Sequence, residues 1–388
     1  MTNAVVVHTD LIDSVEAGQE FGSRISAAFS GSPPDALIVF ASSKYDYGRL
    51  LQALEDSCHP KTMVGCSSAG EFTTAAQGEG MACAVAIRSS DMRFSAAVGR
   101  GLNLDRSGAA ADLVSSFTGM KAHDYRFRSA MVLADALAGY TDELIERLTM
   151  LTAGTYQFVG GGAGDDARFQ RTHVFYGTEP IADAVVALEI LSERPIGIGA
   201  SHGWEPVSDA MRVTEADGTR VISLNATPAV EIFQEHAGAT GQLFDLNDPV
   251  PFFLNNVIGI DTGQGFKLRV PLALSPDGSI AFASNVPAGS IVHIMEASST
   301  STSDAASTAV TSALQQLNGW KPKVALFFDC VATRLRLGKD FGYELDTVRR
   351  ALGKAQLVGC NTYGQIVRAD GQFSGFHNGT AVVCIIPE

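Results

Sequence analysis

The sequence lacks the short motifs that identify several large classes of enzyme and cofactor-binding protein. It contains no Cys-x-x-Cys pair, no Cys-x-x-Cys-His sequence for covalent haem attachment and no His-Glu-x-x-His sequence for zinc. A P-loop and a Gly-x-Ser-x-Gly nucleophile elbow are also absent. These absences argue against the common zinc hydrolases, P-loop nucleotide hydrolases and serine hydrolases.

Cysteine is scarce, and its positions do not form a regular pattern. The 388 residues include six cysteines, which are Cys58, Cys66, Cys83, Cys330, Cys360 and Cys384. In a chain this long, such spacing is more typical of reduced thiols than of a disulfide framework. The thiols therefore indicate a cytoplasmic protein.

Positive charge and long apolar runs are also in short supply. The net charge is −14, and an acidic surface repels phosphate backbones, so we expect no nucleic-acid partner. No apolar run approaches the roughly 20 residues that span a bilayer. The first residues, MTNAVVVHTDLIDS, lack the basic flank and long apolar stretch of a signal peptide. We predict a cytoplasmic chain with no membrane insertion.

The sequence does contain one pattern three times. The copies read VGCSSAGEF (64–72), FVGGGAGDD (158–166) and VGCNTYGQI (358–366). Each copy follows an apolar run and a helical pattern, and each precedes another apolar run. Val64, Val159 and Val358 occupy equivalent positions. Short apolar runs of this kind favour strands covered by helices. We therefore predict an α/β (mixed α+β) fold in which repeated β-α-β-β units form mixed sheets with flanking helices.

A different pattern interrupts the repeat in the second half. Residues 211–224 and 266–283 each predict a hairpin, with Asp-Gly and Pro-Asp-Gly turns. Residues 292–298 predict another strand, and a helix is expected to start at Ser303 or Asp304 and to stop before Asn318-Gly319. We place the boundary between two domains near residue 225, which gives domains of residues 1–224 and 225–388.

The thiols of the first and third copies are candidate nucleophiles. A nucleophilic thiol needs a nearby base or a helix N-terminus that lowers its pKa. The middle copy has Gly161 where the others have Cys66 and Cys360, so the position favours a small residue. Buried packing is the preferred interpretation. A cysteine-dependent enzyme, with His202 or His377 as base, is the alternative.

Polar groups on the three turns are candidate ligand contacts. Consecutive glycines let backbone N–H groups approach a carboxylate or phosphate, although they also suit a plain tight turn. The carboxylates could bind an amine or a cation, or cap a turn. The predicted ligand-binding residues are Cys66, Ser67, Ser68, Glu71, Gly160, Gly161, Gly162, Asp165, Asp166, Cys360, Tyr363 and Gln365.

Two further clusters are candidate cofactor contacts. SHGWEP (201–206) contains His202 and Trp204, and FHNGT (376–380) contains His377 and Asn378. Imidazole can ligate the iron of a non-covalent haem, so either histidine is a possible iron ligand. A hydrogen-bonded structural histidine is the alternative.

The same motifs resemble a known family. VGCSSAGEF, VGGGAGDDARF and SHGWEPV resemble the N-terminal half of FIST-domain proteins, and VGCNTYGQI with FHNGTAVV resembles the C-terminal half. The resemblance extends from about residue 25 to residue 386. The third motif departs from the common Tyr-Thr-Tyr-Gly-Glu form, with Asn361 and Gln365 instead.

The resemblance implies a sensory role. FIST proteins provide input to histidine kinases, chemoreceptors and cyclic-di-GMP enzymes, and they are thought to bind small ligands such as amino acids. Proteins of one branch, NosP, bind haem and sense nitric oxide. The resemblance therefore implies a non-catalytic sensor that signals through a histidine kinase or a cyclic-di-GMP protein, alone or as a homo-oligomer. Haem with nitric oxide is the preferred version, and a metabolite sensor without haem is the alternative. A crevice between the two halves is the expected binding place.

Overall fold

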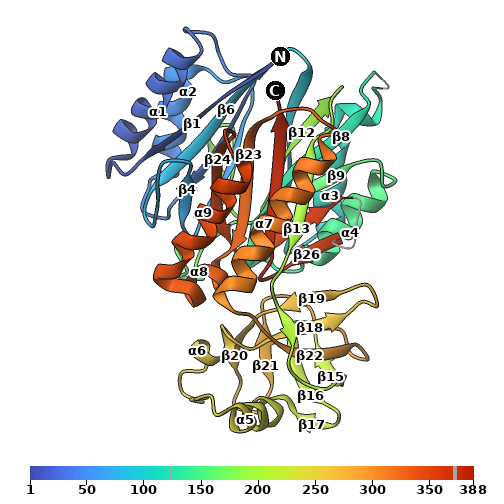
Figure 1. The fold of residues 1–388 in the computed structure, drawn as a ribbon. Helices are drawn as coiled ribbons and strands as arrows, with labels where there is room; N and C mark the ends of the chain where they lie inside the picture. The colour runs from blue at the N-terminus through green and yellow to red at the C-terminus, as the bar shows by residue number, and fades with distance from the viewer. Residues whose placement is uncertain (123, 370–373) are drawn as a thin grey trace.

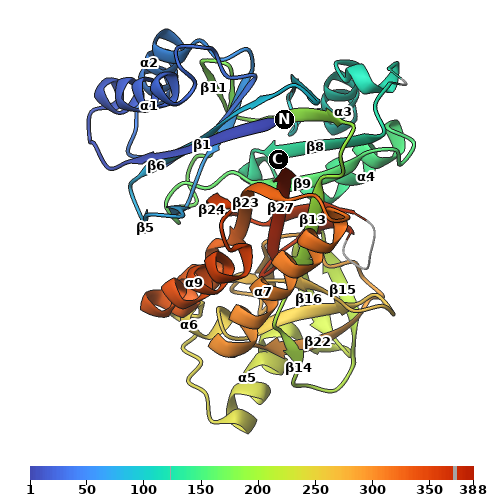
Figure 2. The ribbon, with the colours of Figure 1, turned by 45° about the horizontal axis from the view of Figure 1, so that its top comes forward.

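Three copies of one βα unit form a main body, and residues 205–296 form an inserted part beside it (Figure 1). The computed structural model describes residues 1–122, 124–369 and 374–388. In both views the two chain ends lie close together in the main body (Figures 1 and 2). Within the described ranges, no helix is both long and apolar enough to cross a membrane.

Each unit contains a strand, a helix, a strand, a second helical segment, a third strand, a short hairpin and a final strand, and in the third unit the second helical segment comprises two helices. The first unit comprises β1 (Thr2–Thr9), α1 (Ser14–Ala28), β2 (Ala36–Ala41), α2 (Tyr47–Cys58), β3 (Met63–Ser67), β4 (Glu71–Thr73), β5 (Gln77–Gly78) and β6 (Ala82–Ser89). The second comprises β7 (Met92–Arg100), α3 (Arg106–Ser115), β8 (Phe127–Ala134), α4 (Thr141–Leu151), β9 (Gln157–Gly162), β10 (Val174–Tyr176), β11 (Glu179–Ile181) and β12 (Ala184–Ser192). The third comprises β13 (Gly197–Ser201), α7 (Ser299–Gln316), β23 (Pro322–Cys330), α8 (Val331–Leu337), α9 (Phe341–Leu352), β24 (Gln356–Thr362), β25 (Gln365–Arg368), β26 (Ser374–His377) and β27 (Ala381–Pro387).

The units exchange their short hairpins in a cycle. Strand β4 leaves the first unit and pairs with β24 of the third, β25 pairs with β9 of the second, and β10 pairs with β3 of the first. In each unit the second and third strands are parallel, while the final strand is antiparallel to the second. The α/β class with mixed sheets is confirmed, and the repeat is longer than the predicted β-α-β-β unit because a strand and a helix precede it.

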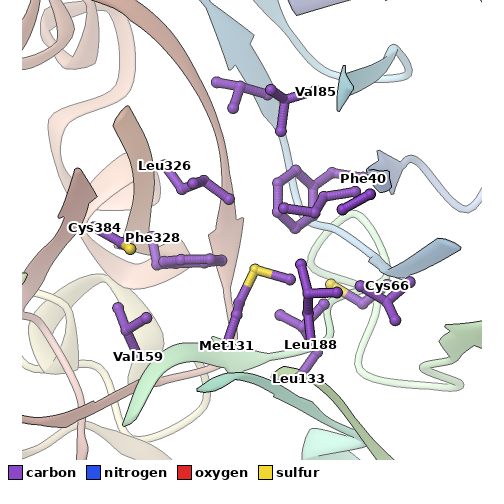
Figure 3. Close-up of a cluster of buried hydrophobic side chains, with 14 of the residues drawn as sticks. Phe40, Cys66, Val85, Met131, Leu133, Val159, Leu188, Leu326, Phe328 and Cys384 are labelled. Carbon is purple, nitrogen blue, oxygen red and sulfur yellow. The ribbon is translucent and has the colours of Figure 1, made fainter. Parts of the chain in front are cut away.

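The three sheets face one another around a single apolar core. Val64, Val159 and Val358, which occupy equivalent positions in the repeat, all lie in this core. Figure 3 shows side chains from all three units pointing toward one another, and the Phe40 and Phe328 rings meet edge to face at 5.8 Å. The helices cover the outer faces of the sheets, where three further apolar clusters lie beneath them.

The inserted part is joined to the third unit between β13 and α7. It comprises β14 (Glu205–Pro206), β15 (Met211–Asp217), β16 (Arg220–Leu224), β17 (Thr227–Pro228), α5 (Ala229–Thr240), α6 (Val250–Phe253), β18 (Val257–Asp261), β19 (Phe266–Arg269), β20 (Pro271–Leu274), β21 (Ile280–Phe282) and β22 (Ile291–Glu296). These strands form one sheet with a cluster of its own. Residue 225, the predicted domain boundary, lies in the connection between β16 and β17.

One helix start was wrong in the sequence interpretation. Helix α7 begins at Ser299, not at Ser303 or Asp304. Ser298 caps it, because its Oγ accepts from Ser301 N–H (3.0 Å) while Ser301 Oγ accepts from Ser298 N–H (3.0 Å). This is a capping box with serine in place of the usual Glu or Gln, so the sequence pattern did not reveal it.

Candidate functional site

The three repeated turns meet and hold one another through backbone hydrogen bonds. Each turn bonds to both of the others. The bonds, with the N–H donor first, are Ala69 to Asn361 (3.0 Å), Asn361 to Gly70 (2.8 Å), Tyr363 to Gly162 (2.9 Å), Gly162 to Gly364 (2.9 Å), Gly164 to Ser67 (2.9 Å) and Asp166 to Ser68 (3.0 Å). The predicted turn residues are therefore brought together, and their backbone N–H groups bond mainly to one another.

The glycine after each repeated valine is required by a close approach of two strands. A Cβ atom on Gly65, Gly160 or Gly359 would lie 2.0 Å from a carbonyl oxygen of the neighbouring parallel strand. No side chain fits at that distance. A Cβ atom on Gly161 or Gly162 would lie 2.8–2.9 Å from its nearest neighbours, which belong to the third turn and to Ala136. The repeated motif thus encodes a backbone shape.

The two candidate nucleophiles lie in the central core. Cys66 and Cys360 have no solvent exposure, and both belong to the apolar cluster shared by the three sheets. Burial, followed by the neighbouring Cys66 thiol, raises the pKa of Cys360 well above its usual value. A nucleophilic thiol needs the opposite shift and access to its substrate. The geometry therefore supports packing at both positions.

Glu71 and Gln365 do the same structural work in two units. Glu71 accepts from Ser68 Oγ (2.5 Å) and from Met81 N–H (3.0 Å), which ties its turn to the start of β6. The Gln365 side chain contacts Thr362 Oγ1 at 2.9 Å and Thr380 at the start of β27. Burial raises the pKa of the Glu71 carboxyl to about 8, so this acid is mostly neutral near pH 7.

The aspartates of the second turn organise the loop that follows β9. Asp165 accepts from the N–H groups of Phe169 (2.8 Å), Gln170 (2.7 Å) and Arg171 (2.8 Å), and also from the Tyr363 hydroxyl. Its lone pairs are therefore largely occupied, as expected of a turn-capping carboxylate.

Asp166 and Ser67 connect this loop to the first unit. Asp166 accepts from Ser42 Oγ (2.8 Å) and from Ser43 N–H (2.8 Å) and Oγ (2.5 Å). Ser67 Oγ accepts from His173 N–H at 2.9 Å. These two residues, which the sequence predicted as ligand contacts, hold loops together, so the three turns form a well-connected platform.

An apolar cavity of about 470 Å³ lies between this platform and the inserted part. The main body contributes Ala136, Leu137, Phe169, Cys330, Val331, Ala332, Leu335, Tyr363, Gly364 and Asn378, and the inserted part contributes Val250, Leu254, Val270, Pro271, Leu272 and Ala283. Leu137, Phe169, Val250, Leu272 and Leu335 remain 39% to 44% exposed, so the opening is apolar as well.

Two polar features mark the wall of this apolar cavity. The Tyr363 ring stacks on Phe169 with centroids 4.3 Å apart, and its hydroxyl is held by Asp165. Asn378 is 2% exposed, and nothing in the described part of the chain hydrogen-bonds its Oδ1. A buried acceptor without a donor costs free energy that a ligand can recover.

Comparisons with known proteins identify the family. A model of the FIST N domain matches residues 35–227, and a model of the FIST C domain matches residues 229–368. The chain belongs to the FIST family. FIST domains are sensory, ligand-binding domains of signal-transduction proteins. No curated protein matches the chain in sequence. A crystal structure of cyanuric acid hydrolase from A. caulinodans aligns over 100% of this chain and 99% of its own at 8% identity, with a TM-score of 0.36, which is too low to support any conclusion.

The predicted haem ligands of this FIST protein do not line the apolar cavity. His202 accepts from Trp204 N–H (3.3 Å) at Nδ1 and contacts Phe266 O (3.2 Å) at Nε2. Trp204 Nε1 donates to Gly379 O at 3.1 Å. His377 is 3% exposed and lines a separate cavity of about 220 Å³. Burial, with help from nearby cations, lowers the His377 pKa to about 3.

The residues around the apolar cavity therefore do not fit haem. None of its described lining residues is a histidine, and none carries a charge to pair with haem propionates. Cys330 and Tyr363 are candidate iron ligands among these residues, but burial raises the pKa of both side chains, which disfavours the thiolate and the phenolate. Among the described residues that line this cavity, Asn378 is the only one of the four predicted cofactor contacts.

Sequence reasoning missed most of the cavity wall. Leu137 and Leu335 lie in short helices, Leu272 lies in β20 and Val270 lies between β19 and β20, where isolated apolar residues resemble ordinary core residues. Two local signals pointed to residues of this wall: VGCNTYGQI, which contains Tyr363, and FHNGT, where Asn378 lies between the last two strands of the fold. The site is formed by single residues that lie far apart in the sequence.

Proposed function

We propose that this FIST protein senses a small, uncharged and mainly apolar molecule, which binds in the apolar cavity. The observation that carries the proposal is an apolar cavity of about 470 Å³ whose lining includes Asn378, a buried residue with an unpartnered acceptor, Oδ1. That size is in the range of small-molecule sites. The matching ligand has one hydrogen-bond donor on an apolar body.

The charge of the walls decides between ligand classes. None of the described residues that line the cavity is charged, so a zwitterionic amino acid would lose hydration without gaining an ion pair. An apolar ligand loses no such hydration, and its burial is favourable by about 25 cal/mol per Å². The ligand-sensing prediction is retained, and its ligand class is refined.

Binding can produce a signal because the cavity has walls from both parts of the molecule. A ligand that contacts both walls favours the arrangement in which they are closest. Arg269 precedes the cavity residue Val270, and Ser284 follows Ala283. These two residues flank the hairpin of β20 and β21, and both donate hydrogen bonds to Asp142 of α4, at 2.8 Å and 2.5 Å. Movement of this hairpin is therefore transmitted to the main body.

The partner and the compartment complete the proposal. We propose a cytoplasmic protein that reports through a histidine kinase or a cyclic-di-GMP signalling protein. Every cysteine is free and buried, which is consistent with a reducing compartment. Haem binding with nitric-oxide sensing stays a prediction, to be checked by absorption spectroscopy after haem addition.

The test is thermal unfolding with phenol and indole, which are uncharged and carry one donor each. Both should raise the melting temperature of the wild-type protein, because a ligand that binds only the folded state stabilises it. Ala283→Leu fills the cavity and should abolish the shift, while the exposed Ala239→Leu should keep it. No shift with either compound, or an equal shift in both variants, would refute the proposal. A Soret band after haem addition would favour haem instead.

A further inference from the structure

A second cavity, of about 450 Å³, lies on the other side of α8. It is lined by Glu71, Phe72, Arg334, Phe341 and Asn361 inside, and by Glu79 and Lys339 at its opening. Leu335 lines both cavities, so the short helix α8 separates them. We name this second space the polar cavity, since its described lining includes acidic and basic residues, which that of the apolar cavity does not.

Two residues that line this polar cavity each have a buried polar atom without a hydrogen-bond partner within the described ranges. These atoms are Oδ1 of Asn361, a residue only 1% exposed, and Nε of Arg334. A Cβ atom built on Gly70, directly before the lining residue Glu71, would lie 2.8 Å from the first and 3.3 Å from the second, so the two atoms lie close to each other. One is an acceptor and the other is a donor.

The remaining groups leave this pair available. Arg334 Nη1 is paired with Glu79 at the opening, so the charge of the guanidinium is already balanced. Both carboxyl oxygens of Glu71 accept hydrogen bonds, and its pKa of about 8 keeps it mostly uncharged near pH 7. Asn361 Nδ2 points to Asp329 at 3.4 Å. The floor of the cavity is therefore polar but close to neutral.

We propose that the polar cavity is a second ligand site, which binds a small neutral molecule carrying a primary amide. An amide places an N–H donor beside a carbonyl acceptor, and so complements Asn361 Oδ1 and Arg334 Nε together. The rings of Phe72 and Phe341 and the side chain of Leu335 provide an apolar wall for the rest of the molecule. A carboxylate would leave Asn361 Oδ1 without a donor, and an ammonium would leave Arg334 Nε without an acceptor.

The test uses three probes of equal size, which are benzamide, benzoate and benzylamine, with the full-length protein. Binding is measured by calorimetric titration and by saturation-transfer NMR. Benzamide should bind about tenfold more tightly than either charged probe, because only benzamide satisfies both buried groups. Tighter binding of benzoate or benzylamine would overturn the assignment, as would no binding at all, which would mean that water bridges the two groups.

Matched variants locate the site. Arg334→Leu and Asn361→Ala should each weaken benzamide binding about tenfold. Glu79→Gln breaks the same ion pair at the opening but leaves Nε in place, so it should bind benzamide within about twofold of wild type. Asn378→Leu alters only the apolar cavity and should also leave the affinity unchanged. Loss of binding in Asn378→Leu but not in Arg334→Leu would place benzamide in the apolar cavity and refute this inference, without refuting the proposed function.

Discussion

Substituting Gly65 with alanine tests whether the repeated motif is a packing requirement. Gly65 lies in β3, directly between β2 and β10. Its new Cβ would sit 2.0 Å from Val39 O and 2.9 Å from the Phe175 ring. Favourable contacts between carbon atoms begin at about 3.5 Å, so one strand has to move by more than an ångström. Both neighbouring strands are buried, and the hairpin of the second unit is anchored here.

The expected cost is large for the addition of one methyl group. Overpacking a core usually costs about 1–3 kcal/mol, and here the obstacle is backbone rather than a flexible side chain. We therefore expect Gly65→Ala to lower the free energy of unfolding by about 3 kcal/mol or more.

The control is Gly238→Ala in α5, where nothing lies within 4 Å of the added Cβ. This change should stabilise the protein by up to about 1 kcal/mol, because alanine is a better helix former than glycine. Urea unfolding followed by circular dichroism gives both values. If Gly65→Ala differed from wild type by less than about 0.5 kcal/mol, the close-approach explanation of the motif would be wrong.

Three further predictions concern buried ionisable groups. The pKa of Glu71 is about 8 in the folded state, above the usual value of 4.5, so the folded state binds a proton that the unfolded state has lost. As the pH rises between these two values, the wild-type protein should therefore lose more stability than Glu71→Gln. A difference in urea midpoint between the two proteins that does not depend on pH would contradict this. Asp142→Ala leaves Arg269 buried without its carboxylate partner and should lower the free energy of unfolding by about 3–5 kcal/mol. The control Glu179→Ala removes an exposed ion pair and should lower it by less than about 1 kcal/mol. Equal losses in the two variants would refute the argument from the buried pair. The six buried thiols should react with a thiol reagent only after unfolding, and rapid labelling of the folded protein would reopen the nucleophile hypothesis.

The repeat could be predicted because all three copies contain the same local sequence pattern. Val64, Val159 and Val358 enter the shared core, and the glycine that follows each one admits the neighbouring strand. Strand periodicity and glycine positions are local signals, so one sequence was enough to align the three turns. The helical pattern that precedes the second copy corresponds to α4 (Thr141–Leu151) for the same reason.

The exchange of hairpins could not be predicted in that way. Strand β4 has three residues and strand β10 has three, and alternation over so short a span does not specify a pairing partner. The partner is chosen by closure of the whole ring of turns, which involves residues about 100 to 300 positions apart, such as Ala69 and Asn361. The apolar cavity depends on the same long-range closure, which is why its wall was missed.

This arrangement also locates the movement that sensing requires. The three units are tied by exchanged hairpins and by six backbone bonds between their turns, so displacing one unit would break pairings in the other two. The inserted part joins the main body at two points in the chain, after β13 and before α7, and packs through a small cluster that includes Leu268, Val270 and Cys330. It also bonds to Asp142 through Arg269 and Ser284. Within the described ranges, however, no strand of the inserted part pairs with a strand of the main body, so fewer backbone hydrogen bonds resist its rotation than resist motion inside the ring. A ligand bound as proposed in the apolar cavity would contact both sides of this boundary, and we therefore expect the signal to be a change in the position of the inserted part relative to the main body.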